Sequence, residues 1–153
     1  MVNELPSMTL RAIGIVRNAV KQPPEPGYNW QDVVSEILID ARLTEALDGL
    51  DEFSHIIVLY WLHQAAATGQ LPNKIHPRGN QKLPLVGRFA TRSPHRPNPV
   101  GKTTVKLRQR QGNVLKVEGL DAIDGTPIID IKPYIPGYDS ATNTQVPKWI
   151  TTQ

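Results

Sequence analysis

TTVKLRQRQGNVLKV, residues 103 to 117, is the stretch that decides the fold. Polar and apolar residues alternate from Thr103 to Arg110 and again from Val114 to Val117, which is the period of a β-strand with one buried face. Between the two runs lies Gln111-Gly112-Asn113, and both glycine and asparagine tolerate the positive φ of a tight turn. The pattern therefore predicts two antiparallel strands joined by a hairpin.

Further short strands are predicted on both sides of this hairpin. Alternation, or a run of β-branched and aromatic residues, marks them at Met8–Arg17, Val33–Ile39, Ser54–Leu62, Leu85–Ala90 and Pro127–Ile131. Leu43–Leu50 is expected to be a short helix or turn, and Ala65–Gln81 a loop. Six or seven short strands with frequent turns predict a mainly β fold, an antiparallel β-barrel with at most one or two short helices.

Length and composition bear on domain organisation and compartment. With 153 residues, no internal repeat and no linker, the chain is expected to form a single domain over residues 1–153. The absence of cysteine excludes disulfides and thiolate metal sites. No stretch resembles a signal peptide, and the longest apolar run, Ile56–Leu62, is too short to span a bilayer. We therefore expect a soluble, cytoplasmic protein with no membrane partner.

Charge is distributed unevenly along the chain. The formal net charge is only +3, but acidic residues prevail from Asp32 to Glu52 and are absent from Lys74 to Lys116. A long cationic span without acids forms a positive face if it stays on one side of the fold, and such a face suits a polyanion. An ordinary solvated basic surface is the alternative.

A proline-rich loop carries part of this positive charge. FATRSPHRPNPVG, Phe89 to Gly101, contains three prolines, which fix φ and stiffen the backbone. Such a loop can hold Arg92 and Arg96 at fixed positions, where a guanidinium suits the paired oxygens of a carboxylate or phosphate. Alternatively, these arginines cap local carbonyl groups. Both interpretations stay open at this point.

Acidic residues gather further along, between Glu118 and Pro136. Asp124-Gly125 is most simply a turn. Asp130 alternates with the isoleucines beside it, so it faces away from them. It is either exposed to solvent or buried against a partner such as an arginine of the proline-rich loop.

Several familiar sites are absent or weak in this sequence. No glycine-rich dinucleotide fingerprint, P-loop or nucleophile elbow is present. His55 and His63 are expected on one face of a strand, but no third ligand accompanies them. His55 lies in an apolar run and is expected in the core, as are Tyr60 and Trp61. We therefore expect no metal, with a metallohydrolase built on the two histidines as the rival.

Five blocks of sequence resemble the TsaA-like family of methyltransferases, of the TrmO type. They cover about residues 10–138 and leave a tail at residues 139–153. The blocks are RAIGIVR (11–17), PPEPGY (23–28), GLDEFSHIIVLYWLHQ (49–64), GRFATRSPHRPNPVGKTTVKL (87–107) and VEGLDAIDGTPIIDIKPYIP (117–136). The chain resembles a short form without the additional C-terminal domain of the larger bacterial enzymes.

The resemblance implies a β-barrel enzyme that uses S-adenosyl-L-methionine, without the glycine fingerprint of Rossmann-like methyltransferases. It implies N6-methylation of threonylcarbamoyl-adenosine 37, beside the anticodon of threonine tRNA, by a homodimer. Two alternatives are a methyltransferase acting on a non-tRNA small molecule and a non-enzymatic RNA-binding protein that has lost its cofactor.

The resemblance also implies cofactor contacts where the family's motifs align. These positions are Pro26, Gly27, Tyr28, His63, Gln64, Arg92, Lys102, Glu118, Gly119, Leu120 and Asp121. Arg92 would hold the carboxylate of the methionine end, Asp121 would accept from the ribose hydroxyls, and Tyr28 would lie near the sulfonium or adenine. Lys102 is expected to act through its backbone.

Two further sets of residues follow from the same resemblance. Asp130 and Tyr134 are candidates for accepting a hydrogen from N6 of the target adenine, although Asp130 is equally a candidate structural partner for arginine. Tyr134 or Trp30 could stack on an extruded base. Cations expected to contact RNA phosphates, in addition to Arg92 and Lys102, are Arg88, Arg96, Lys106 and Arg108.

Overall fold

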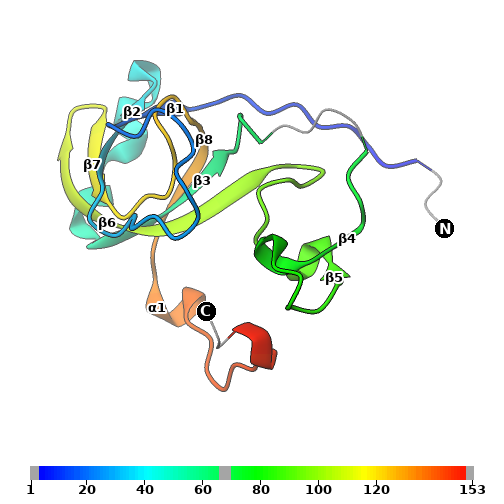
Figure 1. Ribbon diagram of the computed structural model, residues 1–153. Helices are drawn as coiled ribbons and strands as arrows, with labels where there is room; N and C mark the ends of the chain where they lie inside the picture. The colour runs from blue at the N-terminus through cyan, green and yellow to red at the C-terminus, as the bar shows by residue number, and fades with distance from the viewer. Residues whose placement is uncertain (1–3, 66–69, 151–153) are drawn as a thin grey trace.

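The fold is a closed barrel of six antiparallel strands (Figure 1). The computed structural model describes residues 4–65 and 70–150. Around the barrel the order is β1-β2-β7-β6-β3-β8, closed by pairing of Gly14 with Ile128. The strands are β1 Gly14–Arg17, β2 Val34–Ile39, β3 His55–Trp61, β6 Val100–Gln111, β7 Val114–Glu118 and β8 Pro127–Pro133. The predicted mainly β, antiparallel barrel is confirmed.

The predicted hairpin forms the β6–β7 pair. Gln111 pairs with Val114, and Gly112 between them has a φ of +60°, a left-handed value that glycine adopts without a Cβ clash. Alternation along both strands sends the apolar residues inward and the polar ones outward. Val105, Leu115 and Val117 are at most 1% exposed.

One apolar core fills the barrel interior. It is built from inward-facing residues of all six strands, with Leu120 and Ala122 added from the β7–β8 connection. The members that are essentially inaccessible to solvent include Ile37, Ile56, Val58, Leu120 and Ile128. Each buried aliphatic side chain of this size contributes about 1.5–3 kcal/mol relative to exposure, so a closed interior is the main stabilising feature.

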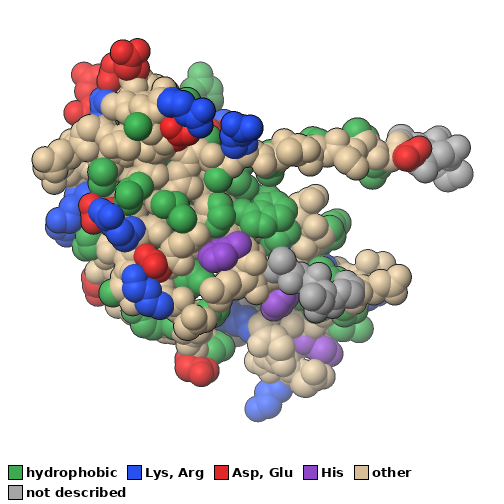
Figure 2. Space-filling model, turned by 90° about the horizontal axis from the view of Figure 1, so that it is seen from above, with side chains coloured by type: hydrophobic (Ala, Val, Ile, Leu, Met, Phe, Trp, Pro, Cys, Tyr) green, Lys and Arg blue, Asp and Glu red, His purple; other side chains and the backbone are tan. Residues whose placement is uncertain are grey.

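The first strand is shorter than predicted. The sequence predicts Met8–Arg17, but β1 begins only at Gly14, and its pairing with the neighbouring strands ends with the backbone hydrogen bonds of Ile13 to Ile128 and Asp40. Residues 4–12 instead form an N-terminal arm that projects from the body (Figures 1 and 2). Its apolar side chains are accessible: Leu5 is 77%, Met8 82% and Leu10 57% exposed.

The predicted strand Leu85–Ala90 is wrong beyond Gly87. Only β5 (Val86–Gly87) is extended there, and it pairs with β4 (Lys74–Ile75) inside the predicted loop Ala65–Gln81. Residues 66–69 of that loop lie outside the described residues. Arg88–Ala90 then form a 3-10 turn, η4, because the backbone N–H and hydroxyl of Thr91 both donate to the Arg88 carbonyl.

The remaining helical segments are short. The sequence predicts a helix or turn at Leu43–Leu50, and 3-10 helix η1 covers Ala41–Leu47. The others are η2 Leu50–Glu52, η3 Pro77–Gly79, α1 Pro136–Asp139 and η5 Lys148–Ile150. Within the described residues, none of these helices has the length and apolar character that a membrane crossing requires.

The direction of the strands determines at which end of the barrel each connection lies. Because neighbouring strands run antiparallel, the connections at residues 18–33, 62–99 and 119–126 all leave from one end, here called the loop end. The β6–β7 turn, the segment at residues 40–54 and α1 lie at the opposite end. Three connections that are far apart in the sequence therefore meet at the loop end.

Candidate functional site

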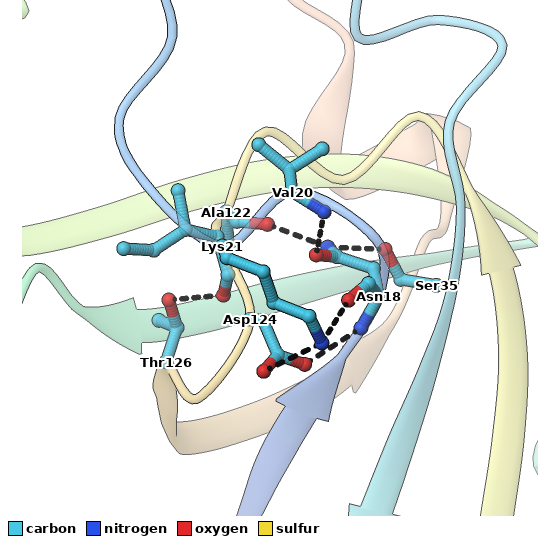
Figure 3. Close-up of polar contacts among 8 residues, drawn as sticks. Asn18, Val20, Lys21, Ser35, Ala122, Asp124 and Thr126 are labelled. Atoms are coloured by element: carbon cyan, nitrogen blue, oxygen red, sulfur yellow. Dashed lines mark hydrogen bonds and ion pairs between the residues drawn. The ribbon is translucent and has the colours of Figure 1, made fainter.

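A buried asparagine joins two of the connections at the loop end (Figure 3). The Asn18 side-chain amide donates to the Ser35 hydroxyl (2.9 Å) and to the Ala122 carbonyl (2.8 Å). Its backbone N–H donates to the Asp124 carboxylate (2.9 Å), which also pairs with Lys21 (3.0 Å). The β1–β2 and β7–β8 connections are thereby held in fixed relative positions.

The PPEPGY segment forms a tight turn within the first of these connections. The Tyr28 N–H donates to the Glu25 carbonyl, with Pro26 and Gly27 at the corners and a Gly27 φ of +88°, the arrangement of a type II turn. The Tyr28 ring is 44% exposed and meets Trp30 edge-on, with ring centroids 5.0 Å apart. The turn therefore presents an accessible tyrosine at the loop end.

Tyr60 and Asp121 form a hydrogen-bonded couple at the mouth of the barrel. The ring of Tyr60 is buried, and its hydroxyl donates to Asp121 Oδ1 (2.7 Å) and lies 2.9 Å from the Thr103 hydroxyl, which also donates to Oδ1. Gly101 lies against the ring, and a Cβ there would fall 2.3 Å from a ring carbon. The Asp121 carboxylate is exposed, and the hydroxyl groups of two barrel strands, β3 and β6, hold its orientation.

Burial and nearby charges set the protonation of the Tyr60 phenol. Burial raises the pKa of the Tyr60 phenol, and the Asp121 carboxylate raises it further, so the phenol stays a neutral donor. The positive charge of Arg92 acts in the opposite direction and lowers the pKa of the Tyr60 phenol.

The three arginines of the proline-rich region have different environments. Arg88 is 7% exposed and donates to the carbonyls of Pro72 and His95, and Arg96 donates to the carbonyls of Thr91 and Ser93. Arg92 is exposed and makes no hydrogen bond or ion pair among residues 4–65 and 70–150. The two interpretations of the loop thus apply to different residues: Arg88 and Arg96 cap local carbonyls, and Arg92 is free to bind an anion.

Most positions of the expected cofactor set lie at the loop end. His63 and the exposed Gln64 directly follow β3, and Glu118 and Gly119 end β7. Two residues of the set have little to offer a cofactor. The Leu120 side chain is fully buried in the core, and the Gly119 N–H already donates to the Val33 carbonyl.

A row of cations runs along the outer face of β6. Lys102, Lys106 and Arg108 are exposed and alternate with inward-facing residues. Arg108 is paired with Glu118, and this ion pair lowers the pKa of the Glu118 carboxyl. Of the cations expected to contact RNA, Lys106 makes no hydrogen bond or ion pair among the described residues, Arg108 is paired with an acid, and the Arg88 and Arg96 guanidiniums donate to carbonyl groups.

The two candidate proton acceptors do not lie together. Tyr134 packs against His55, at the end of β3 remote from Tyr60, and its hydroxyl is bonded to Ser140. Tyr60 lies five steps along the strand from His55, roughly 16 Å at about 3.3 Å per step. Asp130 pairs with Leu59 on the outer face, is 44% exposed and is bonded to Lys132 rather than to an arginine.

The two histidines proposed as a metal pair lie at opposite ends of β3. His55 is exposed and its ring is bonded to Ser54, so its expected place in the core is wrong. No cluster of three or more His, Asp or Glu side chains suited to a metal ion occurs in the described part of the chain.

Comparison with known proteins identifies the barrel. Residues 16–140 match the tRNA-methyltransferase O N-terminal domain. The chain belongs to this family. The resemblance of its motifs to TrmO-type proteins is thereby confirmed, and with it the expectation of a methyltransferase family that uses S-adenosyl-L-methionine.

Relatives of the tRNA-methyltransferase O family differ in how their names describe them. A probable S-adenosyl-L-methionine-binding protein of Methanothermobacter thermautotrophicus is 46% identical over 135 residues, covering 86% of this chain and 93% of the relative. A tRNA (adenine(37)-N6)-methyltransferase of Escherichia coli is 35% identical over 145 residues, covering 88% of this chain. The crystal structure of TrmO from P. aeruginosa superposes with a TM-score of 0.74 at 28% identity, over 96% of this chain.

The larger family members extend beyond the region matched here. The chain spans 60% of the E. coli enzyme and 63% of the P. aeruginosa structure. Archaeal relatives of comparable length exist, since the Methanothermobacter protein is covered over 93% of its length. The barrel with its three loop-end connections is therefore the part that short and long relatives have in common.

Sequence reasoning missed the residues that support the site. The sequence predicts Tyr60 in the core, and its ring is there, but its hydroxyl reaches Asp121. Asn18 follows the first strand and carries no motif of its own. A polar residue directly after a strand, combined with the Asp124-Gly125 turn, is the only available signal, because the contact joins residues 106 positions apart.

Proposed function

We propose that this chain is an S-adenosyl-L-methionine-dependent methyltransferase that acts on N6 of adenosine 37 in tRNA, with the threonylcarbamoyl form in threonine tRNA as substrate. The observation that carries the proposal is Arg92, exposed and without a hydrogen bond or ion pair among residues 4–65 and 70–150, at the same end of the barrel as the Tyr60–Asp121 couple. The family and the names of the E. coli, mouse and human relatives support the reaction.

The chemistry of the loop end fits this cofactor. The Arg92 guanidinium, which has no partner among the residues that the structure describes, suits the carboxylate of the methionine end, since two parallel hydrogen bonds fix its orientation. The exposed Asp121 carboxylate, held by two hydroxyl donors, suits the ribose hydroxyls. The accessible Tyr28 ring suits the adenine or the positively charged sulfur. When bound, the cofactor supplies an electrophilic methyl group.

The residues of this chain bind and orient the reactants. Alignment of donor and acceptor provides most of the rate enhancement for such a transfer, because the reactive group is already activated. The attacking nitrogen becomes acidic as its new bond forms, so a weak acceptor is sufficient to take its proton. Asp130 is the candidate acceptor for this proton. It lies near Tyr60 along the barrel, since it pairs with Leu59, and Tyr60 pairs with Ile128 of the same strand.

A homodimer would account for two features of the single chain. The apolar side chains of the N-terminal arm are exposed, which is unfavourable unless another surface covers them. Tyr134 lies at the far end of the barrel, so it can approach a cofactor only at the loop end of a second copy. We therefore include a second subunit in the proposal.

Calorimetry with S-adenosylmethionine tests the cofactor site. Wild-type protein is expected to bind, and Arg92→Ala to weaken binding about tenfold or more, because a charge-assisted hydrogen-bonded pair is lost. Arg42→Ala is the control, an exposed arginine at the opposite end that is paired with Asp40. Equal affinity of the Arg92 variant and the wild type would refute the assignment.

Mass spectrometry of tRNA nucleosides after incubation tests the acceptor. The expected product is threonylcarbamoyl-adenosine carrying one additional methyl group. Cofactor binding with unchanged nucleosides would contradict the tRNA substrate and favour a small-molecule acceptor. Binding of tRNA without any heat from the cofactor would instead favour a non-enzymatic RNA-binding protein.

A further inference from the structure

The β3–β6 connection contains a lobe, residues 70–99, that stands beside the barrel (Figure 1). It is built on the small β4–β5 sheet and ends in the proline-rich segment. The lobe contains six cationic side chains and no acidic one: Lys74, Arg78, Lys82, Arg88, Arg92 and Arg96. Its composition alone makes it strongly positive.

Buried hydrogen bonds give the lobe a defined shape. The guanidinium of Arg88 joins the Pro72 carbonyl, before β4, to the His95 carbonyl in the proline-rich segment. The backbone N–H of Arg88 donates to Asn73, and the Leu62 N–H donates to Pro99 at the other end of the connection. Side chains on its surface are therefore presented at fixed positions.

An aromatic ring is exposed on this lobe. Phe89 is 77% exposed, a high value for a phenylalanine in an ordered 3-10 turn. The guanidinium carbon of Arg96 lies 5.7 Å from the ring centroid, and Arg96 is itself fixed by two carbonyls. The ring is thus supported by a cation and open to solvent, three residues before Arg92.

Three of the lobe's cations are open in addition to Arg92. Lys74, Arg78 and Lys82 are exposed and form no side-chain hydrogen bond or ion pair within the described ranges 4–65 and 70–150. Arg78 has a φ of +57°, a left-handed conformation that costs a non-glycine residue of order 1 kcal/mol or more. The 3-10 turn η3 imposes this conformation, and the arginine side chain is exposed on the lobe.

We propose that this lobe is an RNA-binding element, in which Phe89 stacks on an unpaired base and Lys74, Arg78 and Lys82 contact phosphates. The inference rests on the proposed function, because it places the stacked base near Arg92 and the cofactor. Exposed aromatic rings beside cations are how proteins hold single-stranded nucleic acid. A second copy of this chain suits the surface less well, since equal charges would oppose each other.

Base stacking and phosphate contacts affect RNA affinity and its salt dependence differently. The two can be distinguished by measuring binding of an anticodon stem-loop RNA with adenosine 3′ of the anticodon. Phe89→Ala is expected to weaken binding roughly 5- to 150-fold with an unchanged salt dependence, because stacking releases no counterions. The triple variant Lys74→Gln/Arg78→Asn/Lys82→Gln is expected to lower the slope of log affinity against log salt by about 2, at about 0.7 per contact.

Two variants provide matched controls. Tyr138→Ala removes an 85% exposed aromatic ring from α1, at the opposite end, and Lys116→Gln removes an exposed cation from β7. Both are expected to bind the stem-loop as the wild type does. Asparagine at position 78 tolerates the left-handed backbone, so the triple variant retains the turn.

The outcomes separate this inference from the proposed function. If wild-type protein binds the stem-loop and neither lobe variant changes its affinity, the lobe is not the RNA-binding element and the methyltransferase proposal stands. If wild-type protein binds cofactor but no RNA, both the lobe and the tRNA substrate are refuted. If Phe89→Ala changes the subunit number by light scattering but leaves RNA affinity unchanged, the surface is a dimer contact.

Discussion

At the scale of single residues, Tyr60 links the core of the barrel to its surface. Its ring packs on Gly101 inside the barrel, and its hydroxyl donates to Asp121 at the mouth. A phenol held neutral by burial is a dependable donor to a carboxylate over the whole physiological pH range. Tyr60 is therefore a positioning residue for Asp121.

Substitution of Tyr60 by phenylalanine tests this role. The ring and its packing remain while the donor to Asp121 is lost, so affinity for S-adenosylmethionine is expected to fall about tenfold, the value of a hydrogen bond to a charged group. Calorimetry measures the affinity, and urea unfolding measures stability. The control is Thr44→Val, which also removes a hydroxyl donor, from η1 at the opposite end of the barrel. Equal affinities of the two variants would refute a positioning role.

Asn18 is the residue on which the loop end depends for stability. Its buried amide has two acceptors, Ser35 and Ala122, which would lose their donor in Asn18→Ala. We expect the variant to lower the free energy of unfolding by about 1–3 kcal/mol, measured by urea denaturation. Asn29→Ala, at an exposed asparagine bonded to Asp32, should change it by less than about 0.5 kcal/mol. A larger effect at Asn29 would contradict this account.

Residue types in the sequence indicated the chemistry but not which side chains are free. Arg88, Arg92 and Arg96 are equivalent by composition, and only the fold shows that two of them are engaged by carbonyl groups. The partners of Arg88, at Pro72 and His95, depend on how the β4–β5 lobe closes. No local pattern contains that information.

At the scale of elements, periodicity predicted the strands that have a buried face. The hairpin at residues 103–117 was predicted because its alternation persists over two strands and a turn. β6 nevertheless begins earlier than predicted, at Val100, because pairing with β3 extends it across Gly101. The small β4–β5 sheet was missed, since two-residue strands are too short to show a period.

The contact between the loops at the loop end should make stability depend on pH. The Asn18 N–H, and then Lys21, lower the pKa of Asp124 below its usual value of 3.8. A carboxyl with a depressed folded-state pKa stabilises the protein above its unfolded-state pKa, and this contribution is lost as pH falls through the folded-state value. The stabilisation by Asp124 is thus complete at neutral pH and disappears in strong acid.

Comparison with Asp124→Asn isolates this effect. The difference in unfolding free energy between wild type and variant is expected to be largest near pH 6 and to shrink below about pH 4. Urea unfolding at pH 6, 4 and 3 measures it. The difference is needed because other acids with lowered pKa, such as Glu118, also contribute to the wild-type curve. A difference that stays constant over this range would show that the ionised carboxylate does not matter.

At the scale of the whole molecule, the barrel separates its two ends by role. The loop end contains Arg92, Asp121 and the positive lobe, while the acids of residues 32–52 lie mainly along β2 and at the opposite end. A polyanion is thereby attracted to one end and disfavoured at the other. For the proposed RNA substrate, this asymmetry would orient the polyanion before any specific contact forms.

The N-terminal arm bears on how many chains the active protein contains. Leu5, Met8 and Leu10 project from the barrel in the single chain and are not part of its core. If a second copy covers these side chains, the triple variant Leu5→Ser/Met8→Ser/Leu10→Ser should be a monomer by light scattering where the wild type is a dimer. The free energy of unfolding of the monomeric barrel should stay unchanged. Ser7→Ala/Thr9→Ala, in the same arm, should remain dimeric. A wild-type protein that is monomeric at all concentrations, or a triple variant that stays dimeric, would show that the arm does not join two subunits.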